Sequence, residues 1–239
     1  MKLITLATLG VVTAACVLAQ PAGDPKTQEK VAAIKQSIEQ NQAQLKQYSW
    51  VETTTISLKG EVKKTEQKSC MYGADGKVVK TAIAGAPQQQ PQDSGGGGRR
   101  GGRGGKVKAK VIENKVEDLK EYMAEAAALI KQYVPPNPQT MQASLKAGKA
   151  AIDKASGHVV FSDYAKPGDK VTLTFDSAAK KLSGFDVSTY LDKPQDTVTL
   201  KANFSRLEDG TSYMQESVLD VKAKNVVVKT TNGGYKKAR

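Results

Sequence analysis

The stretch Thr197-Val-Thr-Leu-Lys-Ala-Asn-Phe-Ser-Arg-Leu207 decides the fold class of this chain. Its apolar side chains, at Val198, Leu200, Ala202 and Phe204, alternate with Thr, Lys, Asn and Ser. A period of two is typical of a β-strand with one face covered and the other in water. Because an antiparallel sheet with one apolar face needs a covering layer, the stretch predicts a sheet packed against helices.

The same alternation extends outward from this stretch in both directions. Turn-forming sequences such as Lys166-Pro-Gly-Asp169 and Glu208-Asp-Gly210 interrupt it at intervals of about 8–12 residues, which is typical of an antiparallel meander. The predicted strands are Tyr48–Leu58, Glu61–Tyr72, Lys77–Ile83, Lys149–Asp153, His158–Phe161, Lys170–Phe175, Lys181–Tyr190, Thr197–Leu207, Thr211–Val221 and Asn225–Thr231.

Three segments with helical periodicity are the candidates for the covering layer. The first is predicted over Asp24–Gln47, and the second begins near Asn114 and ends before Pro135-Pro136. A short third helix is predicted from Asn137-Pro138 through Leu145. The second helix carries an apolar stripe made of Val116, Leu119, Met123, Ala126, Ile130 and Tyr133. The predicted fold is therefore α+β, a curved antiparallel sheet forming an incomplete barrel and covered by about three helices.

The first nineteen residues have the pattern of a secretory signal peptide. Lys2 precedes the apolar run Leu3–Cys16, and cleavage is expected after Ala19. The run is too short to span a membrane, so the expected location is the periplasm or outside the cell, without a transmembrane span. Thr13-Ala-Ala-Cys16 also resembles a bacterial lipobox, but Thr13 stands where Leu is usual, so lipidation at Cys16 is the less favoured alternative.

One long segment breaks the periodic pattern. Residues 85–110 include Pro87-Gln-Gln-Gln-Pro91 and the Gly/Arg-rich run Gly95–Gly105. They offer nothing to bury, and glycine loses the most entropy on ordering, so a disordered loop is predicted here. The elements on its two sides cannot stand alone, and residues 20–239 are therefore expected to form a single domain interrupted by this loop.

The charge of the chain is concentrated outside the expected folded body. The 239 residues contain 36 Lys and Arg against 24 Asp and Glu, a formal charge of +12. Ala86–Lys110 holds six of the basic residues against a single acid, and Lys236, Lys237 and Arg239 add three more at the C-terminus. Any binding of polyanions is thus expected at the loop and at the tail.

The candidate polyanion-binding residues are Arg99, Arg100 and Arg103. They resemble an arginine–glycine tract that binds nucleic acid, but the tract is short and no aromatic residue interleaves it. A nucleic-acid partner is therefore not favoured. The alternatives left open are an acidic envelope polymer, a lipid headgroup, or a solvated loop with no partner.

The sequence carries no recognised catalytic or metal-binding motif. With one His and two Cys, the chain has too few soft ligands for a zinc site or an iron–sulfur cluster, and no cofactor is expected. His158 is the only imidazole, and no nucleophile elbow accompanies it. Cys70 is read as a strand residue rather than as a reactive thiol, since no His lies near it in sequence. We therefore expect a protein without catalytic activity.

The order of elements resembles the outer-membrane lipoprotein carrier and sorting proteins. The likeness is carried by Tyr48-Ser-Trp50, by the hairpin Leu58-Lys-Gly-Glu-Val62, and by Leu173–Asp176 with Lys181–Val187. It covers most of the chain after Ala19 as topology, and the sequence looks closer still to a group of exported bacterial proteins with no assigned activity. The resemblance implies a half-open curved sheet that wraps around helices and holds acyl chains between them.

Two hypotheses about function follow. The first is an envelope protein that binds a lipid or lipoprotein acyl chain between sheet and helices; the second is a surface protein that binds acidic partners through its basic loop and tail. Filled core is the alternative reading of every residue proposed to line the apolar site, and neither the ligand nor the oligomeric state is indicated. The candidate lining is Trp50, Ile56, Leu58, Val171, Leu173, Phe175, Val198, Leu200 and Phe204.

Overall fold

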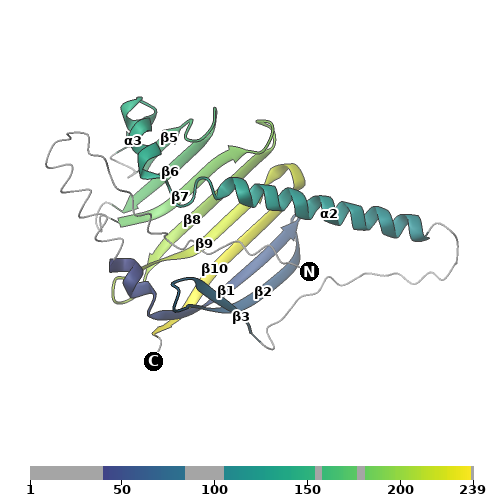
Figure 1. Cartoon of the computed structure of the whole chain (residues 1–239), viewed down its shortest axis with the longest axis horizontal. Helices are drawn as coiled ribbons and strands as arrows, with labels where there is room; N and C mark the ends of the chain where they lie inside the picture. Colours follow the sequence, from purple (N-terminus) through teal and green to yellow (C-terminus); the bar gives the residue numbers. More distant parts are fainter. Residues whose placement is uncertain (1–39, 84–104, 154–157, 177–180, 238–239) are drawn as a thin grey trace.

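Ten antiparallel strands form one curved sheet that does not close into a barrel (Figure 1). The structure is a computed structural model, and it describes residues 40–83, 105–153, 158–176 and 181–237. The strand order across the sheet is β3-β2-β1-β10-β9-β8-β7-β6-β5-β4. The predicted fold class, a curved antiparallel sheet with helices, is confirmed. The predicted first helix, Asp24–Gln47, is described only from residue 40, and residues 40–45 are helical. The part of the predicted disordered loop before residue 105 lies outside the described residues.

The strand bounds agree with the predicted meander to within a few residues everywhere except at the C-terminus. The strands are β1 (Tyr48–Leu58), β2 (Glu61–Tyr72), β3 (Val78–Ala82), β4 (Ala150–Asp153), β5 (His158–Ser162), β6 (Lys170–Asp176), β7 (Lys181–Tyr190), β8 (Thr197–Arg206), β9 (Ser212–Val221) and β10 (Val226–Lys237).

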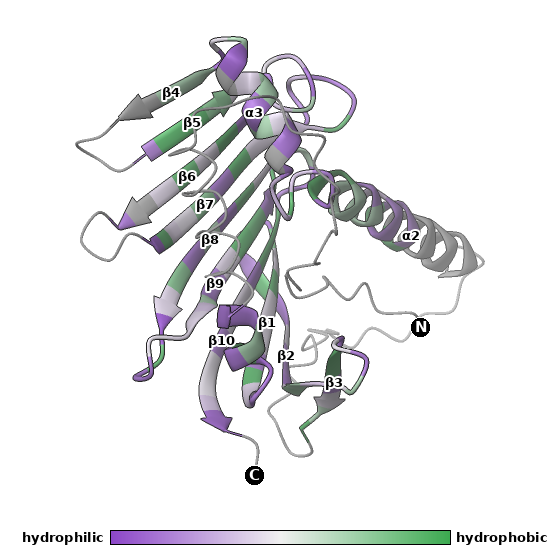
Figure 2. Ribbon diagram, turned by 60° about the vertical axis from the view of Figure 1, so that its left-hand side comes forward, coloured by the Kyte–Doolittle hydropathy of each residue, from purple (hydrophilic) through white to green (hydrophobic). Residues whose placement is uncertain are grey.

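The path of the chain explains why the sheet has two distant edges. Strands β1 to β3 lead to one edge of the sheet, which β3 forms. In the sequence, the helices α2 (Gly105–Ile130) and α3 (Pro138–Lys146) come between β3 and β4, and β4 forms the opposite edge. From β4 the chain returns strand by strand until β10 pairs with β1. Figures 1 and 2 show α2 lying across one face of the sheet, so that face is called the inner face below.

The alternation in β8 sorts its side chains onto the two faces as the sequence predicts. Val198, Leu200 and Ala202 are buried on the inner face. They lie opposite Val221, Leu219 and Ser217 of β9, so the register carries the apolar rows from strand to strand. A slip by one residue would turn these rows toward solvent, which fixes the register. The outer face is rich in Thr, Lys and Ser.

The short helix α3 begins as its sequence predicts. The Asn137 side-chain oxygen accepts hydrogen bonds from the backbone N–H groups of Gln139 at 2.8 Å and Thr140 at 3.3 Å. Pro138 follows as the first helical residue, where its missing N–H costs nothing.

Two elements extend beyond their predicted bounds. Helix α2 begins at Gly105, not near Asn114, so the irregular segment ends earlier than expected; Lys106–Lys110 contains good helix formers and no breaker. Strand β10 continues past Thr231 to Lys237, where a basic tail was expected. Gly234 has φ +64°, and this left-handed residue forms a bulge that lets the strand continue past Asn232-Gly233. Lys236 and Lys237 are therefore part of the sheet, opposite Ser49 and Tyr48.

A buried carboxylate anchors the C-terminal end of α2 to the sheet. The Asp169 side chain is fully buried and accepts hydrogen bonds from the backbone N–H groups of Tyr164, Ala165 and Lys166. The hydroxyl of Tyr133, just past α2, donates to the same carboxylate at 2.7 Å. The turn between β5 and β6 thus holds the end of the helix in place.

Candidate functional site

The apolar stripe of α2 is buried at one end only. Ala126, Ile130 and Tyr133 are fully or almost fully buried against the inner face. Toward the N-terminus of the helix, Met123 is only half-buried and Val116 is 47% exposed. Figure 1 shows that the N-terminal part of α2 extends beyond the strands. The helix is therefore anchored at its C-terminal end, and Val116, nearer its N-terminus, is an apolar side chain that the described strands leave largely uncovered.

Tyr122 lies at the boundary between these two halves of the helix. Its ring packs against the core cluster, and the Lys224 ammonium lies 4.7 Å from the ring centroid. Its hydroxyl is buried, yet it has no hydrogen-bond partner among the described residues. Burial raises the pKa of this hydroxyl, with a smaller contribution from nearby carboxylates, so it stays a neutral donor. A buried donor without an acceptor costs free energy and calls for a physical explanation.

The inner face offers further half-buried apolar surface on both sides of the buried cluster. On β1 and β10 the side chains of Ile56, Leu58 and Val228 pack against the cluster without being fully buried. On β8 and β9 the same is true of Phe204 and Met214. The apolar part of the inner face is thus wider than the strip that α2 covers.

The structure brings most of the predicted lining residues to this face. Val171, Leu173, Val198 and Leu200 are buried in the cluster under the helix. Ile56, Leu58 and Phe204 flank it, as described above. The side chain of Phe175 lies outside the described part of the structure.

Trp50 also faces inward, but it belongs to a separate aromatic group near the ends of β1, β2 and β10. Its ring stacks on Tyr235 at 5.7 Å between centroids and lies 5.5 Å from Tyr72. The indole N–H donates to the Asn232 side-chain oxygen at 3.2 Å. The neighbours of the Trp50 ring are thus tyrosines near the end of the sheet, and Trp50 does not belong to the apolar cluster under α2.

Beside this aromatic group the inner face becomes charged. Glu52 on β1 and Lys80 on β3 form an ion pair with 2.7 Å from the ammonium to each carboxylate oxygen. Both side chains are at least 90% buried. An ion pair buried this deeply needs close contacts to offset the free-energy cost of desolvation, and the two distances of 2.7 Å provide them.

The described surroundings of Cys70 and His158 contain no group arranged to activate either side chain. The Cys70 thiol is fully buried on β2, and burial, with the nearby Glu52 carboxylate, raises its pKa to about 11. A thiol with this pKa is protonated at neutral pH and is a poor nucleophile. His158 is exposed at the start of β5. Within the described ranges, His, Cys, Asp and Glu side chains nowhere gather in threes as metal ligands do.

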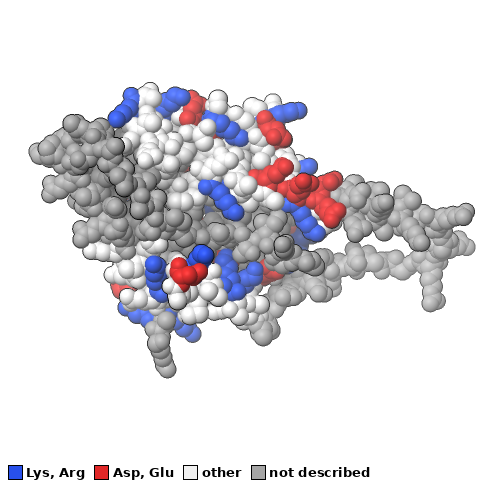
Figure 3. All heavy atoms as spheres, viewed as in Figure 1, with Lys and Arg blue, Asp and Glu red and all other residues white. Residues whose placement is uncertain are grey.

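The candidate polyanion-binding residues cannot be placed. Arg99, Arg100, Arg103 and Arg239 lie outside the described residues. On the side shown in Figure 3, the described Lys and Arg side chains are scattered among acidic ones, and the acids gather over α2. The prediction of a flexible basic tail at the C-terminus is wrong for Lys236 and Lys237, which belong to β10. The Lys237 ammonium lies 3.5 Å from the Asp209 carboxylate.

Comparisons of the chain with protein-family models, with curated proteins and with solved structures find no match. The resemblance to lipoprotein carriers therefore stays a prediction from the sequence. Among the described helices, none is both long and apolar enough to cross a membrane.

Sequence reasoning missed Tyr122, although a signal for it exists. The predicted stripe follows Leu119, Met123 and Ala126, whereas Tyr122 and Leu129 lie on the adjoining row of the same helix. Residues three and four apart share a face, so a wider stripe would have included both. The ion pair of Glu52 and Lys80 has no comparable signal in the sequence. The two residues come together only because β2 pairs with both β1 and β3.

Proposed function

We propose that the protein is a noncatalytic carrier that binds one acyl chain of a lipid or lipoprotein between α2 and the inner face of the sheet. The acyl chain lies along the half-buried apolar side chains beside the helix, and the ester or amide carbonyl of the ligand accepts a hydrogen bond from the Tyr122 hydroxyl. The observation that carries this proposal is the buried hydroxyl of Tyr122, which has no hydrogen-bond partner in the described part of the chain.

Three features of the inner face support an acyl chain as the occupant. Its surface beside the helix is apolar, which favours a ligand without charge along most of its length. Among the described residues, the one buried side-chain nitrogen or oxygen without a hydrogen-bond partner is the Tyr122 hydroxyl, a donor, and an acyl ester supplies the acceptor. The half-buried stripe of α2 gives such a chain a second apolar wall. The expected signal peptide and the likeness to lipoprotein carriers agree with this function.

The variant Tyr122→Phe tests the proposal, with cis-parinaric acid as a fluorescent acyl-chain probe. We expect the wild-type protein to bind the probe saturably and Tyr122→Phe to bind it about three- to tenfold more weakly, because one hydrogen bond to the carboxyl end is lost. The matched control is Glu121→Gln, an exposed position on the same helix, which should leave the affinity unchanged.

A second measurement separates ligand binding from folding. Since the Tyr122 hydroxyl has no described partner, Tyr122→Phe should leave the unliganded protein as stable as the wild type, or more stable, in urea. Weaker probe binding together with unchanged or raised stability supports the proposal. Equal probe binding by both proteins, or a loss of stability without the probe, contradicts it.

A further inference from the structure

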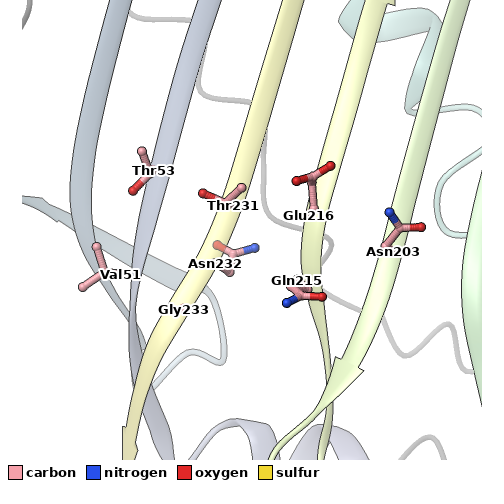
Figure 4. Close-up of a pocket in the computed structure, with 8 residues that line it drawn as sticks. All are labelled: Val51, Thr53, Asn203, Gln215, Glu216, Thr231, Asn232 and Gly233. Atoms are coloured by element: carbon pink, nitrogen blue, oxygen red, sulfur yellow. The ribbon is translucent and has the colours of Figure 1, made fainter.

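An open hollow of about 510 Å³ lies on the sheet at β1, β10, β9 and β8 (Figure 4). Its wall on one side is Val51 and Thr53 of β1, and its wall on the other side includes Gln215 and Glu216 of β9. The register places Thr53 opposite Thr231, next to the inward pair of Glu52 and Asn232. The hollow therefore opens on the outer face, away from α2 and from the proposed acyl site.

Two irregularities of the sheet create this hollow. In β9 the register shifts between the pairs Asn203–Glu216 and Phe204–Met214, so Gln215 is an extra residue. Gln215 and Glu216 consequently both line the outer face, which a regular strand would not allow. The second irregularity is the bulge at Gly234 of β10, and bulges bend and twist the strand that carries them.

Gly233 leaves the floor of the hollow without a side chain. It lies on β10, between β1 and β9, and it is not in the left-handed region. A Cβ atom added there would have no heavy atom within 4 Å. Any ordinary strand residue would therefore fit at this position and fill the hollow.

The groups around the floor are polar but almost neutral in sum. The side-chain amides of Asn203 and Gln215 are exposed and have no hydrogen-bond partner among the described residues. Each amide offers donors and an acceptor together, as a sugar hydroxyl does. The carboxylate of Glu216 is already paired with Lys229 at 2.7 Å, so little charge is left to attract an anion.

We propose that this hollow binds a neutral saccharide unit. Its volume lies within the range of small-ligand sites, about 300–1,000 Å³. The amides of Asn203 and Gln215 bind adjacent hydroxyls, and the open floor at Gly233 admits the ring. The methyl groups of Val51 and of the threonines contact its C–H surface. The site is separate from the acyl-chain site, because it opens on the opposite face of the sheet.

The test is a titration of the full chain, followed by backbone amide NMR shifts, with neutral trisaccharides of glucose and of N-acetylglucosamine as probes. We expect shifts confined to the lining residues at millimolar probe. Gly233→Val should weaken binding at least about tenfold by filling the floor, and Asn203→Ala with Gln215→Ala should weaken it about five- to twentyfold. Thr199→Val, on the outer face of β8 away from the hollow, is the matched control and should bind like the wild type.

The amide double variant keeps the test valid if Gly233→Val fails to fold. Binding that is lost in the variants and kept in the control supports the site. The proposal is overturned if no trisaccharide shifts these amides, if the shifts fall elsewhere, or if Gly233→Val binds as the wild type does. Preferential binding of a sulfated trisaccharide would also overturn it, since it would show an anion site.

Discussion

At the residue scale, Asp169 shows how a buried charge can be tolerated in this fold. Its carboxylate is fully buried, but three backbone N–H groups and the Tyr133 hydroxyl surround it with donors. Hydrogen bonds to an ionised acceptor are stronger than neutral ones, so this arrangement offsets the cost of burial. The same bonds tie the turn after β5 to the end of α2.

Asp169→Asn should lower the free energy of unfolding by about 2–4 kcal/mol, because an amide nitrogen would then face backbone donors. Urea denaturation measures the change. Asp163 lies in the same turn but is exposed and accepts only one described backbone bond, from Gly168 at 2.8 Å. Asp163→Asn should therefore cost no more than about 1 kcal/mol. Equal losses in the two variants would refute the role given to Asp169.

A second residue-scale prediction concerns acid. The Tyr48 hydroxyl donates to the Asp209 carboxylate at 2.6 Å and holds the pKa of that carboxyl well below its usual range, with further contributions from Thr211. A lowered folded-state pKa stabilises the protein above the unfolded pKa, about 3.9, and this stabilisation is lost as the pH falls toward the folded value.

Tyr48→Phe should accordingly lower Tm at pH 7. The difference in Tm between variant and wild type should shrink as the pH falls below about 4, where Asp209 in the variant and in the unfolded chain becomes protonated. Thermal unfolding between pH 7 and pH 2 follows this difference. A difference in Tm that stays constant across the range would show that Asp209 is not the partner that matters.

At the element scale, the short edge strand β3 is held to its neighbours by a buried ion pair. Lys80 of β3 reaches across β2 to Glu52 of β1. Lys80→Met should cost about 3 kcal/mol, because it leaves the Glu52 carboxylate buried without this partner. In hydrogen exchange, the amides of Val78–Ala82 should then lose protection before those of β1.

Two further variants check this prediction. Adding Glu52→Gln to Lys80→Met should restore part of the lost stability, since it removes the unpaired charge. Lys77→Met, which breaks the exposed contact with Asp75 at 3.6 Å, should change stability by less than about 0.5 kcal/mol. If Lys80→Met is as mild as Lys77→Met, the pair does not hold β3.

The elements themselves were largely predictable from local sequence, and the exceptions have long-range causes. Alternation assigned the inner face of β8, and Asn137-Pro138 marked the start of α3, because both signals lie within a few residues. The continuation of β10 past Asn232-Gly233 depends on its pairing with β1, which no local pattern contains. The ion pair of Glu52 likewise has a long-range cause, because its partner Lys80 lies 28 residues away.

At the scale of the whole molecule, the open sheet gives the protein two faces of different chemistry. The inner face joins an apolar region under α2 to a charged region beside the aromatic group. The outer face is polar and carries the hollow at Gly233. Of the candidate acyl site, sequence periodicity predicted the apolar rows but not Tyr122. The hollow could not be predicted at all, because it arises where bulges in two strands meet across the sheet.

The acyl-chain carrier is the central claim, and native mass spectrometry of the protein purified from its own host tests it most directly. Wild-type protein should carry an added mass equal to one lipid or acylated ligand, and that species should diminish in Tyr122→Phe relative to Glu121→Gln. A wild-type protein that carries only its own mass, under conditions that preserve a known lipid-binding control, would contradict the claim.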